Sequence, residues 1–162
     1  MLPRAPLLNS LLALALFVPL SGGAEDLAKL QQQLARESDP DDRAKITVKI
    51  GQELLKQVSR AYEKGEGEEA ERLLGDYREA IRTAHEDLKQ SGRDARRKPK
   101  GFKDLEIHLR KSTKKLEDLG HNLSFDERAA LDEAIAEMEG IRQELLEDLM
   151  RRDARQESGS GA

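Results

Sequence analysis

A basic segment that contains glycine and proline divides this chain into two regions of helical pattern, and it restricts the possible folds more than any other feature. Residues 89–115 hold eleven Lys or Arg against three acids, a net charge of +8. Residues 117–148 hold eleven acids against two arginines, a net charge of −9. Because glycine and proline disfavour a continuous helix, we interpret residues 92–101 as the hinge between two helical pairs.

Five stretches of the chain place apolar residues every three or four positions, which is the spacing of amphipathic helices. We expect a short helix over residues 25–37, long helices over 40–64, 68–88 and 102–123, and a last helix that follows Ser124 and reaches Arg155. No stretch alternates β-branched with polar residues over the length of a strand. The sequence therefore predicts an all-α fold: a helical bundle of two antiparallel hairpins (four main helices) plus a short N-terminal helix.

Capping residues and breakers set the predicted helix boundaries. Asp39 can accept hydrogen bonds from free backbone N–H groups, and Pro40 fits the first turn of the helix that follows it. The glycines at positions 65 and 67 end the second helical pattern, and so short a connection makes the second and third helices an antiparallel hairpin. Ser124 and Glu127 have the spacing of a capping box, which predicts the start of the last helix.

The first residues have the layout of a secretory signal peptide: a cationic residue, an apolar run and a group of small residues. Arg4 precedes the apolar residues 11–20, and the small residues 21–24 follow them. The apolar run is shorter than the roughly 20 residues that a membrane-spanning helix needs. We therefore expect a Sec-type signal peptide cleaved near Gly23 or Ala24, and a periplasmic or secreted protein. An uncleaved N-terminal anchor is the alternative.

Cleavage at that point would divide the chain into three parts. Residues 1–24 would be the signal peptide, residues 25–155 a single helical domain, and residues 156–162 a disordered tail rich in Gly and Ser. We expect no transmembrane segment in the mature chain. The sequence does not specify an oligomeric state.

The residue content argues against catalysis. The chain has no Cys, which excludes disulfides, thiolate metal sites and a thiol nucleophile. It also lacks a Gly-rich phosphate loop and a Gly-x-Ser-x-Gly nucleophile elbow. We therefore predict a protein that is not an enzyme and needs no cofactor. Carboxylates are so common that no pair stands out, and a hydrolase with a carboxylate site is a reading that the residues leave open.

Two of the histidines follow an acid by four residues, which places each pair on one helix face. His108 follows Asp104, and His121 follows Glu117. Such a pair can chelate a metal ion, and it is also an ordinary surface pair worth a few tenths of a kcal/mol. The alternative function is therefore a periplasmic metal-responsive or metal-sequestering helical protein that uses His108 and His121.

The basic segment supplies the candidate binding residues. They are Arg93, Arg96, Arg97, Lys98, Lys100 and Lys103. We expect the loop charges to project into water, where they could attract anionic lipid headgroups or polyanionic polymers of the cell envelope. An exported protein rarely meets nucleic acid, so nucleic acid is an unlikely partner. The competing interpretation is that the basic fourth helix and the acidic fifth helix neutralise each other, which leaves the loop as a solvated connector.

Two resemblances accompany these patterns. The segments Gly92-Arg93-Asp94-Ala95-Arg96-Arg97, 101–107 and 145–150 resemble a group of uncharacterised exported α-helical bacterial proteins of unknown function, which implies no activity. Separately, Leu123-Ser124-Phe125-Asp126-Glu127 looks like the Leu-Thr-x-x-Gln motif of periplasmic stress chaperones and metal-responsive helical proteins. Here Ser replaces Thr, Glu replaces Gln, and the chain carries one copy where those proteins usually carry two.

Together the patterns predict an exported, non-enzymatic helical protein that acts by binding. The predicted role is that of an envelope scaffold, an adaptor or a chaperone-like protein. Its partner would be a protein or an anionic component of the envelope, bound through the basic loop between helices.

Overall fold

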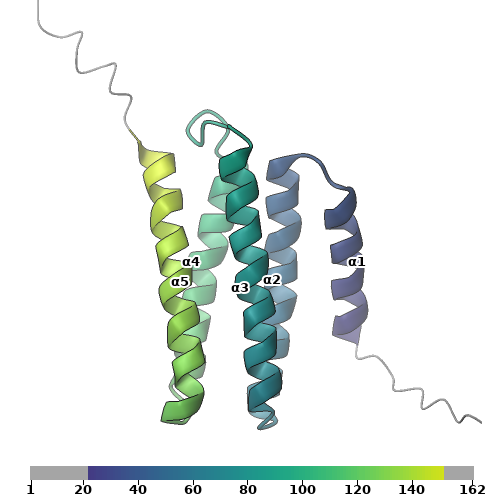
Figure 1. The fold of residues 1–162 in the computed structure, drawn as a ribbon, viewed down its shortest axis with the longest axis vertical. Coiled ribbons are helices and arrows are strands. Elements are labelled where there is room, and N and C mark those ends of the chain that lie inside the picture. Colours follow the sequence, from purple (N-terminus) through teal and green to yellow (C-terminus); the bar gives the residue numbers. More distant parts are fainter. Residues whose placement is uncertain (1–21, 152–162) are drawn as a thin grey trace, which may run out of the picture.

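The computed structural model describes residues 22–151, which form five helices and no strand (Figure 1). The helices are α1 (Gly22–Arg36), α2 (Pro40–Glu63), α3 (Gly67–Gln90), α4 (Lys100–Gly120) and α5 (Phe125–Met150). The prediction of an all-α helical bundle is confirmed. The first 21 residues of the predicted signal peptide and the whole predicted tail lie outside the described residues. Within the described range, no helix combines the length and the apolar character needed to span a membrane.

Four helices form the bundle, and α1 lies outside it. α2 packs against α3 and α4, and α5 packs against α4 and α3, whereas α1 contacts α2 alone among the described helices. The loop of residues 91–99 and the α1–α2 connection lie at one end of the bundle, and the other two turns lie at the opposite end (Figure 1). This topology makes α2 and α4 run in the same direction.

Leucine dominates the core, as expected from a chain with few aromatic residues. The largest fully buried side chains are Val58, Leu74, Tyr77, Ile81, Leu88, Leu105, Leu109, Leu116, Leu131, Met138 and Leu145. Burial of one such side chain stabilises the fold by about 1.5–3 kcal/mol. The residues recur on one face of each helix, so the apolar stripe fixes how each helix is rotated about its own axis.

The capping signals at Asp39 and Ser124 act as predicted, whereas other helix ends differ from the prediction: α1 begins at Gly22, and α4 spans Lys100–Gly120. The Asp39 side chain accepts hydrogen bonds from the backbone N–H groups of Asp41 and Asp42 at 2.9 and 3.3 Å. Glu127 accepts from the backbone N–H and the hydroxyl of Ser124 at 3.1 and 2.6 Å. The last helix does not continue through residue 151 toward the predicted end at Arg155. It ends at Met150, beyond which the backbone of Arg151 is no longer helical.

Candidate binding site

The basic segment lies at the end of the bundle where α1 joins α2 (Figure 1), and it brings Arg93 against the start of α2. The Arg93 guanidinium donates to both carboxylate oxygens of Asp39 and pairs with Asp41 at 2.7 Å. Its side chain is only 21% exposed. The prediction that the loop cations project into water is therefore wrong for Arg93, because the acids in the first turn of α2 hold it.

The start of α4 is tied to the same acids. Nζ of Lys100 lies 3.1 Å from a carboxylate oxygen of Asp42, and the backbone N–H of Gly101 donates to Asp41 at 3.1 Å. Position 101 has no room for a side chain, since a Cβ there would lie 2.6 Å from the Asp41 carboxylate. The first turns of α2 and α4 are thus held together by ion pairs and by a backbone hydrogen bond.

The other predicted binding residues are more accessible. Asp94 accepts a hydrogen bond from the backbone N–H of Arg96 at 2.9 Å, and its carboxylate lies 3.6 Å from Nε of Arg97. The Arg97 side chain is 83% exposed, and Lys98 and Lys103 are exposed as well. Lys100 is 58% exposed although it pairs with Asp42. Arg96 is only 30% exposed, with its Nε 3.8 Å from Asp94, so the prediction that it projects into water is wrong as well.

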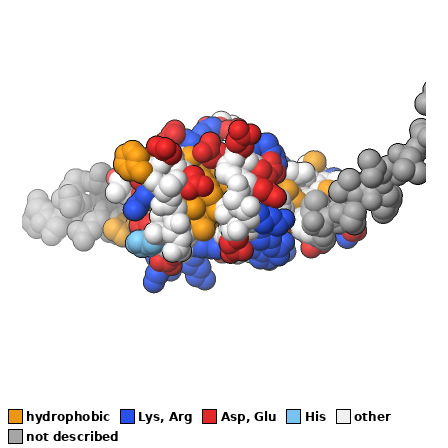
Figure 2. All heavy atoms as spheres, turned by 90° about the horizontal axis from the view of Figure 1, so that it is seen from below, with side chains coloured by type: hydrophobic (Ala, Val, Ile, Leu, Met, Phe, Trp, Pro, Cys, Tyr) orange, Lys and Arg blue, Asp and Glu red, His pale blue; other side chains and the backbone are white. Residues whose placement is uncertain are grey.

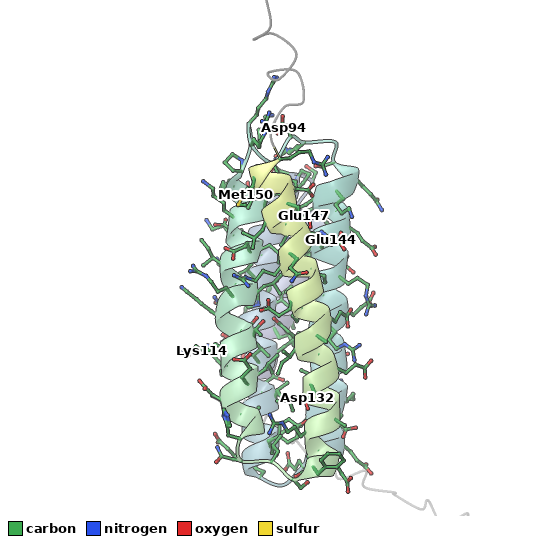
Figure 3. The ribbon with its side chains drawn as sticks, turned by 90° about the vertical axis from the view of Figure 1, so that its left-hand side faces the viewer. Asp94, Lys114, Asp132, Glu144, Glu147 and Met150 are labelled. Carbon is green, nitrogen blue, oxygen red and sulfur yellow. The ribbon has the colours of Figure 1, made fainter. Side chains whose placement is uncertain are left out.

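Within residues 22–151, the ion pairs that acids of α5 make with another helix are with α3. Glu137 pairs with Arg78 at 2.5 Å and with Arg82 at 2.7 Å, and Glu144 pairs with Lys89 at 2.8 Å. Figure 3 shows Glu144 on the side of α5 that faces α3.

We expected ion pairs between cations of α4 and acids of α5. In the described part of the chain, the ion pair between these helices instead joins an acid of α4 to a cation of α5. Glu106 of α4 accepts from Arg142 of α5 at 3.0 Å. Lys114 of α4 points away from α5 in Figure 3. The hypothesis that a basic fourth helix and an acidic fifth helix neutralise each other is therefore wrong, although the two helices do pack together.

Lysines that α4 turns away from α5 line a groove between α2 and α4. The groove has a volume of about 520 Å³ and is lined by five lysines, one aspartate and several apolar side chains. The lysines are Lys45, Lys49 and Lys56 of α2, with Lys111 and Lys115 of α4. In the end-on view of Figure 2, Lys and Arg side chains gather along the lower edge, which is the side of α2 and α4.

Most of the lysines in this groove lack an internal counter-ion. Lys56 pairs with Glu53 of its own helix at 2.6 Å. The other four pair with no carboxylate of residues 22–151, and they are Lys45, Lys49, Lys111 and Lys115. Asp104 is the one acid that lines the groove. The groove therefore combines an excess of positive charge with an apolar floor, which suits an anionic partner.

A buried chain of hydrogen bonds reaches the floor of the groove, where His108 and Ser112 are among the lining residues. The Tyr77 hydroxyl donates to Oγ of Ser112 at 2.7 Å, and Ser112 donates to the Leu109 carbonyl at 3.0 Å. Because the Tyr77 proton is used in this way, its oxygen accepts from Nε2 of His108, 3.3 Å away. Burial lowers the pKa of His108 to about 4, so the imidazole is neutral at physiological pH.

A glycine on α2 makes room for this network. A Cβ at Gly51 would lie 2.9 Å from Nε2 of His108 and 3.1 Å from the Tyr77 ring. The same helix elsewhere carries full side chains at the α2–α4 contact, including Leu55, which is buried. Because Gly51 has no side chain, His108 of α4 can lie between α2 and Tyr77 of α3.

The structure does not bring the two candidate metal-binding histidines together. His108 is buried, whereas His121 lies exposed just beyond the end of α4. The helix rise of 1.5 Å per residue separates them by roughly 20 Å. No three His, Asp or Glu side chains of the described range are arranged to hold a metal ion.

The remaining histidine, His85, is also buried, which the sequence reasoning missed. Its Nε2 has no hydrogen-bond partner within the described residues and lies 3.8 Å from the Glu144 carboxylate. Burial lowers its pKa, against the opposing effect of Glu144. The signal was present: His85 follows Ile81 by four residues and precedes Leu88 by three, so helical spacing places it on the apolar face.

The groove lysines were missed for a related reason. Sequence reasoning selected the densest run of cations, whereas the groove draws its cations from two helices far apart in the chain. Lys45 and Lys49 recur at helical spacing on α2, as do Lys111 and Lys115 on α4. That spacing reveals a basic stripe on each helix, but it does not reveal that the two stripes lie side by side.

Comparisons with protein-family models, curated proteins and solved structures found no match to this chain. The two resemblances drawn from the sequence therefore stay predictions.

Proposed function

We propose that this chain is an exported, non-enzymatic protein that binds an anionic partner in the cell envelope, as a scaffold, an adaptor or a chaperone-like protein. In this proposal its frame is two antiparallel hairpins, α2–α3 and α4–α5, with α2 and α4 side by side. The packing of α2 on α3 and of α5 on α4 supports that arrangement. The signal-peptide pattern supports export, and the absence of catalytic motifs from the sequence supports a binding role.

The observation that carries the proposal is the contrast between paired and unpaired cations. The long cations of α3 that face α5 all meet carboxylates, namely Arg78, Arg82 and Lys89. The four unpaired lysines of the α2–α4 groove share its lining with a single acid, Asp104. Like charges held close together repel, and a partner that supplies carboxylates, phosphates or sulfates would relieve that repulsion.

Exposed cations of the predicted binding set lie on α4 and on the loop before it. Lys103 precedes Ile107 of the groove by four residues, so helical spacing places the two as neighbours on α4. Arg97 and Lys98 are exposed in the loop that precedes α4. Arg93 and Lys100 serve a different purpose, since they hold the loop and α4 against α2.

The test measures binding of three anionic probes to the mature protein at low and at high salt. The probes are a heparin-like polymer, vesicles that contain anionic lipid, and an acidic polypeptide. Two variants are compared with the wild type, one with the four unpaired groove lysines changed to Gln and one with Arg97, Lys98 and Lys103 changed to Gln. We expect salt-sensitive binding of at least one probe, with the larger loss in the groove variant.

A wild-type protein that binds none of the three probes at low salt would contradict the proposed function. Binding that both variants retain in full would also contradict it, because the cations that motivate the proposal would then play no part. Circular dichroism of each variant checks that the helices are intact.

A further inference from the structure

We propose that the α2–α4 groove binds one acidic amphipathic helix of a partner protein. This inference rests on the proposed function and specifies its partner. The groove, its two basic rims and its apolar floor carry the argument.

The groove has the length and direction of a short helix. Its lining residues run from Lys45 to Lys56 on α2 and from Asp104 to Lys115 on α4. At 1.5 Å per residue, each wall extends over roughly 16 Å, or about three helical turns. Because α2 and α4 run in the same direction, the two walls stay in register along this length. Two packed helices leave a groove that accepts the ridge of a third helix.

The floor gives a helix an apolar stripe to contact. Val48 and Leu55 of α2 and Ile107 of α4 line the groove. Ile107 is 38% exposed, although most large apolar side chains of the described chain are buried. An amphipathic helix with apolar residues at i, i+3, i+4 and i+7 would place two or three side chains on this floor.

The lysines on both sides of the groove favour a partner helix with negative charge on both flanks of its apolar face. Lys45 and Lys49 stand on the α2 side, and Lys111 and Lys115 stand on the α4 side. Their lack of internal partners leaves them available to carboxylates at helical spacing. A helix with Glu or Asp on each side of its apolar stripe complements both rims at once, which sets its position as well as its affinity.

Other anionic ligands use less of this surface. A single lipid headgroup engages one or two cations, whereas the four unpaired lysines are spread along two walls. A flat membrane surface would need several apolar side chains that protrude, whereas Ile107 is the one large apolar side chain among the groove-lining residues that is exposed. A sulfated polymer would be held by the lysines alone and would gain nothing from the apolar floor.

The experiment measures the affinity of two fluorescent peptides of about 18 residues, long enough for partial helix formation. One carries Leu along a single helix face with Glu on both flanks. The other has the same composition in scrambled order, so it has the same charge and no apolar face. We expect the amphipathic peptide to bind at least about tenfold more tightly, a difference of about 1.4 kcal/mol, and to gain helix on binding.

Three protein variants assign the binding to the groove. Lys49→Gln with Lys111→Gln removes one cation from each rim and should weaken binding about tenfold at low salt. Ile107→Ser should weaken binding of the amphipathic peptide about fivefold and leave the scrambled peptide unaffected. Arg36→Gln with Lys64→Gln is the matched control, since it removes the same charge from two exposed positions outside the groove and should change affinity less than twofold.

Four outcomes would overturn the inference. They are equal affinity for both peptides, no binding of the amphipathic peptide up to about 1 mM, an Ile107→Ser variant with wild-type affinity, and self-association of the protein that the Lys49/Lys111 variant abolishes. The last would make a second copy of this chain the occupant. If vesicles or the polymer still bind with salt sensitivity, the proposed function stands while this inference fails. If no anionic probe binds, both fail.

Discussion

The guanidinium of Arg93 pairs with the carboxylate of Asp39, and the two residues are 54 positions apart in the chain. Asp39 is also the N-cap of α2. The same carboxylate therefore accepts hydrogen bonds from free backbone N–H groups at the start of a helix and holds a distant loop through Arg93. The pair therefore connects a local folding signal to the tertiary arrangement of α2, the loop and α4.

This double role predicts an acid-sensitive contribution of Asp39 to stability. The pKa of Asp39 is held at about 2, below its ordinary value of 3.8, first by the hydrogen bond from Arg93 and then by the backbone N–H groups that it caps. A carboxyl whose folded pKa is lowered stabilises the fold above its unfolded pKa and loses that effect as the pH falls through the folded value. Asp39→Asn keeps a capping side chain but removes the charge.

The measurement is the melting temperature of wild type and Asp39→Asn between pH 7 and pH 2. We expect the wild type to be the more stable above about pH 4 and the difference to shrink toward pH 2. Asp76→Asn removes the same charge from an exposed pair with Arg72 and should show a smaller difference throughout. A constant gap between wild type and Asp39→Asn at all pH values would count against the role of the ion pair.

Three glycines on helices should respond in opposite ways to the same substitution. Gly75→Ala and Gly140→Ala should each raise stability by about 0.5–1 kcal/mol, because Ala favours helix and a Cβ there meets no atom within 4 Å. Gly51→Ala should lower stability despite the same gain in propensity, since its Cβ would lie 2.9 Å from His108. Urea unfolding of the three variants checks the prediction, and a more stable Gly51→Ala protein would contradict the packing described here.

The hydrogen bond between Tyr77 and Ser112 should appear as a coupling energy. Tyr77→Phe removes the donor to Ser112, which keeps its bond to the Leu109 carbonyl, and it also removes the acceptor of the buried His108 N–H, so the expected loss is about 1–3 kcal/mol. Ser112→Ala removes the acceptor and should cost a similar amount. A double-mutant cycle by urea unfolding should give a combined loss smaller than the sum, and strict additivity would show that the two side chains do not interact.

Buried neutral histidine predicts a loss of stability in mild acid. The folded pKa of His108 is about 4, below its ordinary value of 6.5, so the unfolded chain takes up a proton first. Stability should therefore fall as the pH drops from about 6.5 toward 4. His108→Gln should flatten this slope, whereas His121→Gln changes an exposed ring and should leave it intact. Equal slopes in both variants would exclude His108 as the cause.

Export can be tested by mass. If the signal-peptide prediction holds, protein recovered from the periplasm or the medium starts at Ala24 or Glu25, and its intact mass shows the loss of the preceding residues. Full-length protein in the membrane fraction would instead favour the uncleaved anchor. A Leu-rich run disrupted by two Asp substitutions within residues 11–20 is the control that should abolish export.

Features of the fold that depend on near neighbours in sequence were predictable. The caps at Asp39 and Ser124 need only the next three residues, and the helices themselves follow from apolar spacing. The end of α5 was less predictable, because no Gly or Pro stands next to Met150 in the sequence to mark it. Local signals therefore defined the helices better than their last turns.

Ion pairing between helices could not be read from net charge. The rotation of α4 is set by Leu105, Leu109 and Leu116, and this rotation directs lysines such as Lys111 toward α2 and not toward α5. Net charge describes a whole helix, whereas pairing depends on which face each charge occupies. The same limit hid the burial of Arg93, since its partner Asp39 is distant in the sequence.

α1 contacts α2 and no other described helix. We therefore expect α1 to unfold separately from the four-helix bundle α2–α5. Removal of residues up to Ala24 would leave a helix near the length of about 12–15 residues at which isolated helices are marginal in water. Amide protons of α1 should therefore exchange with solvent through local opening, long before those of α2–α5 exchange through global unfolding. Each opening would expose Leu27, Leu30 and Leu34 together with the face of α2 that they cover, so the chain would present a transient apolar surface while its four-helix core stays folded.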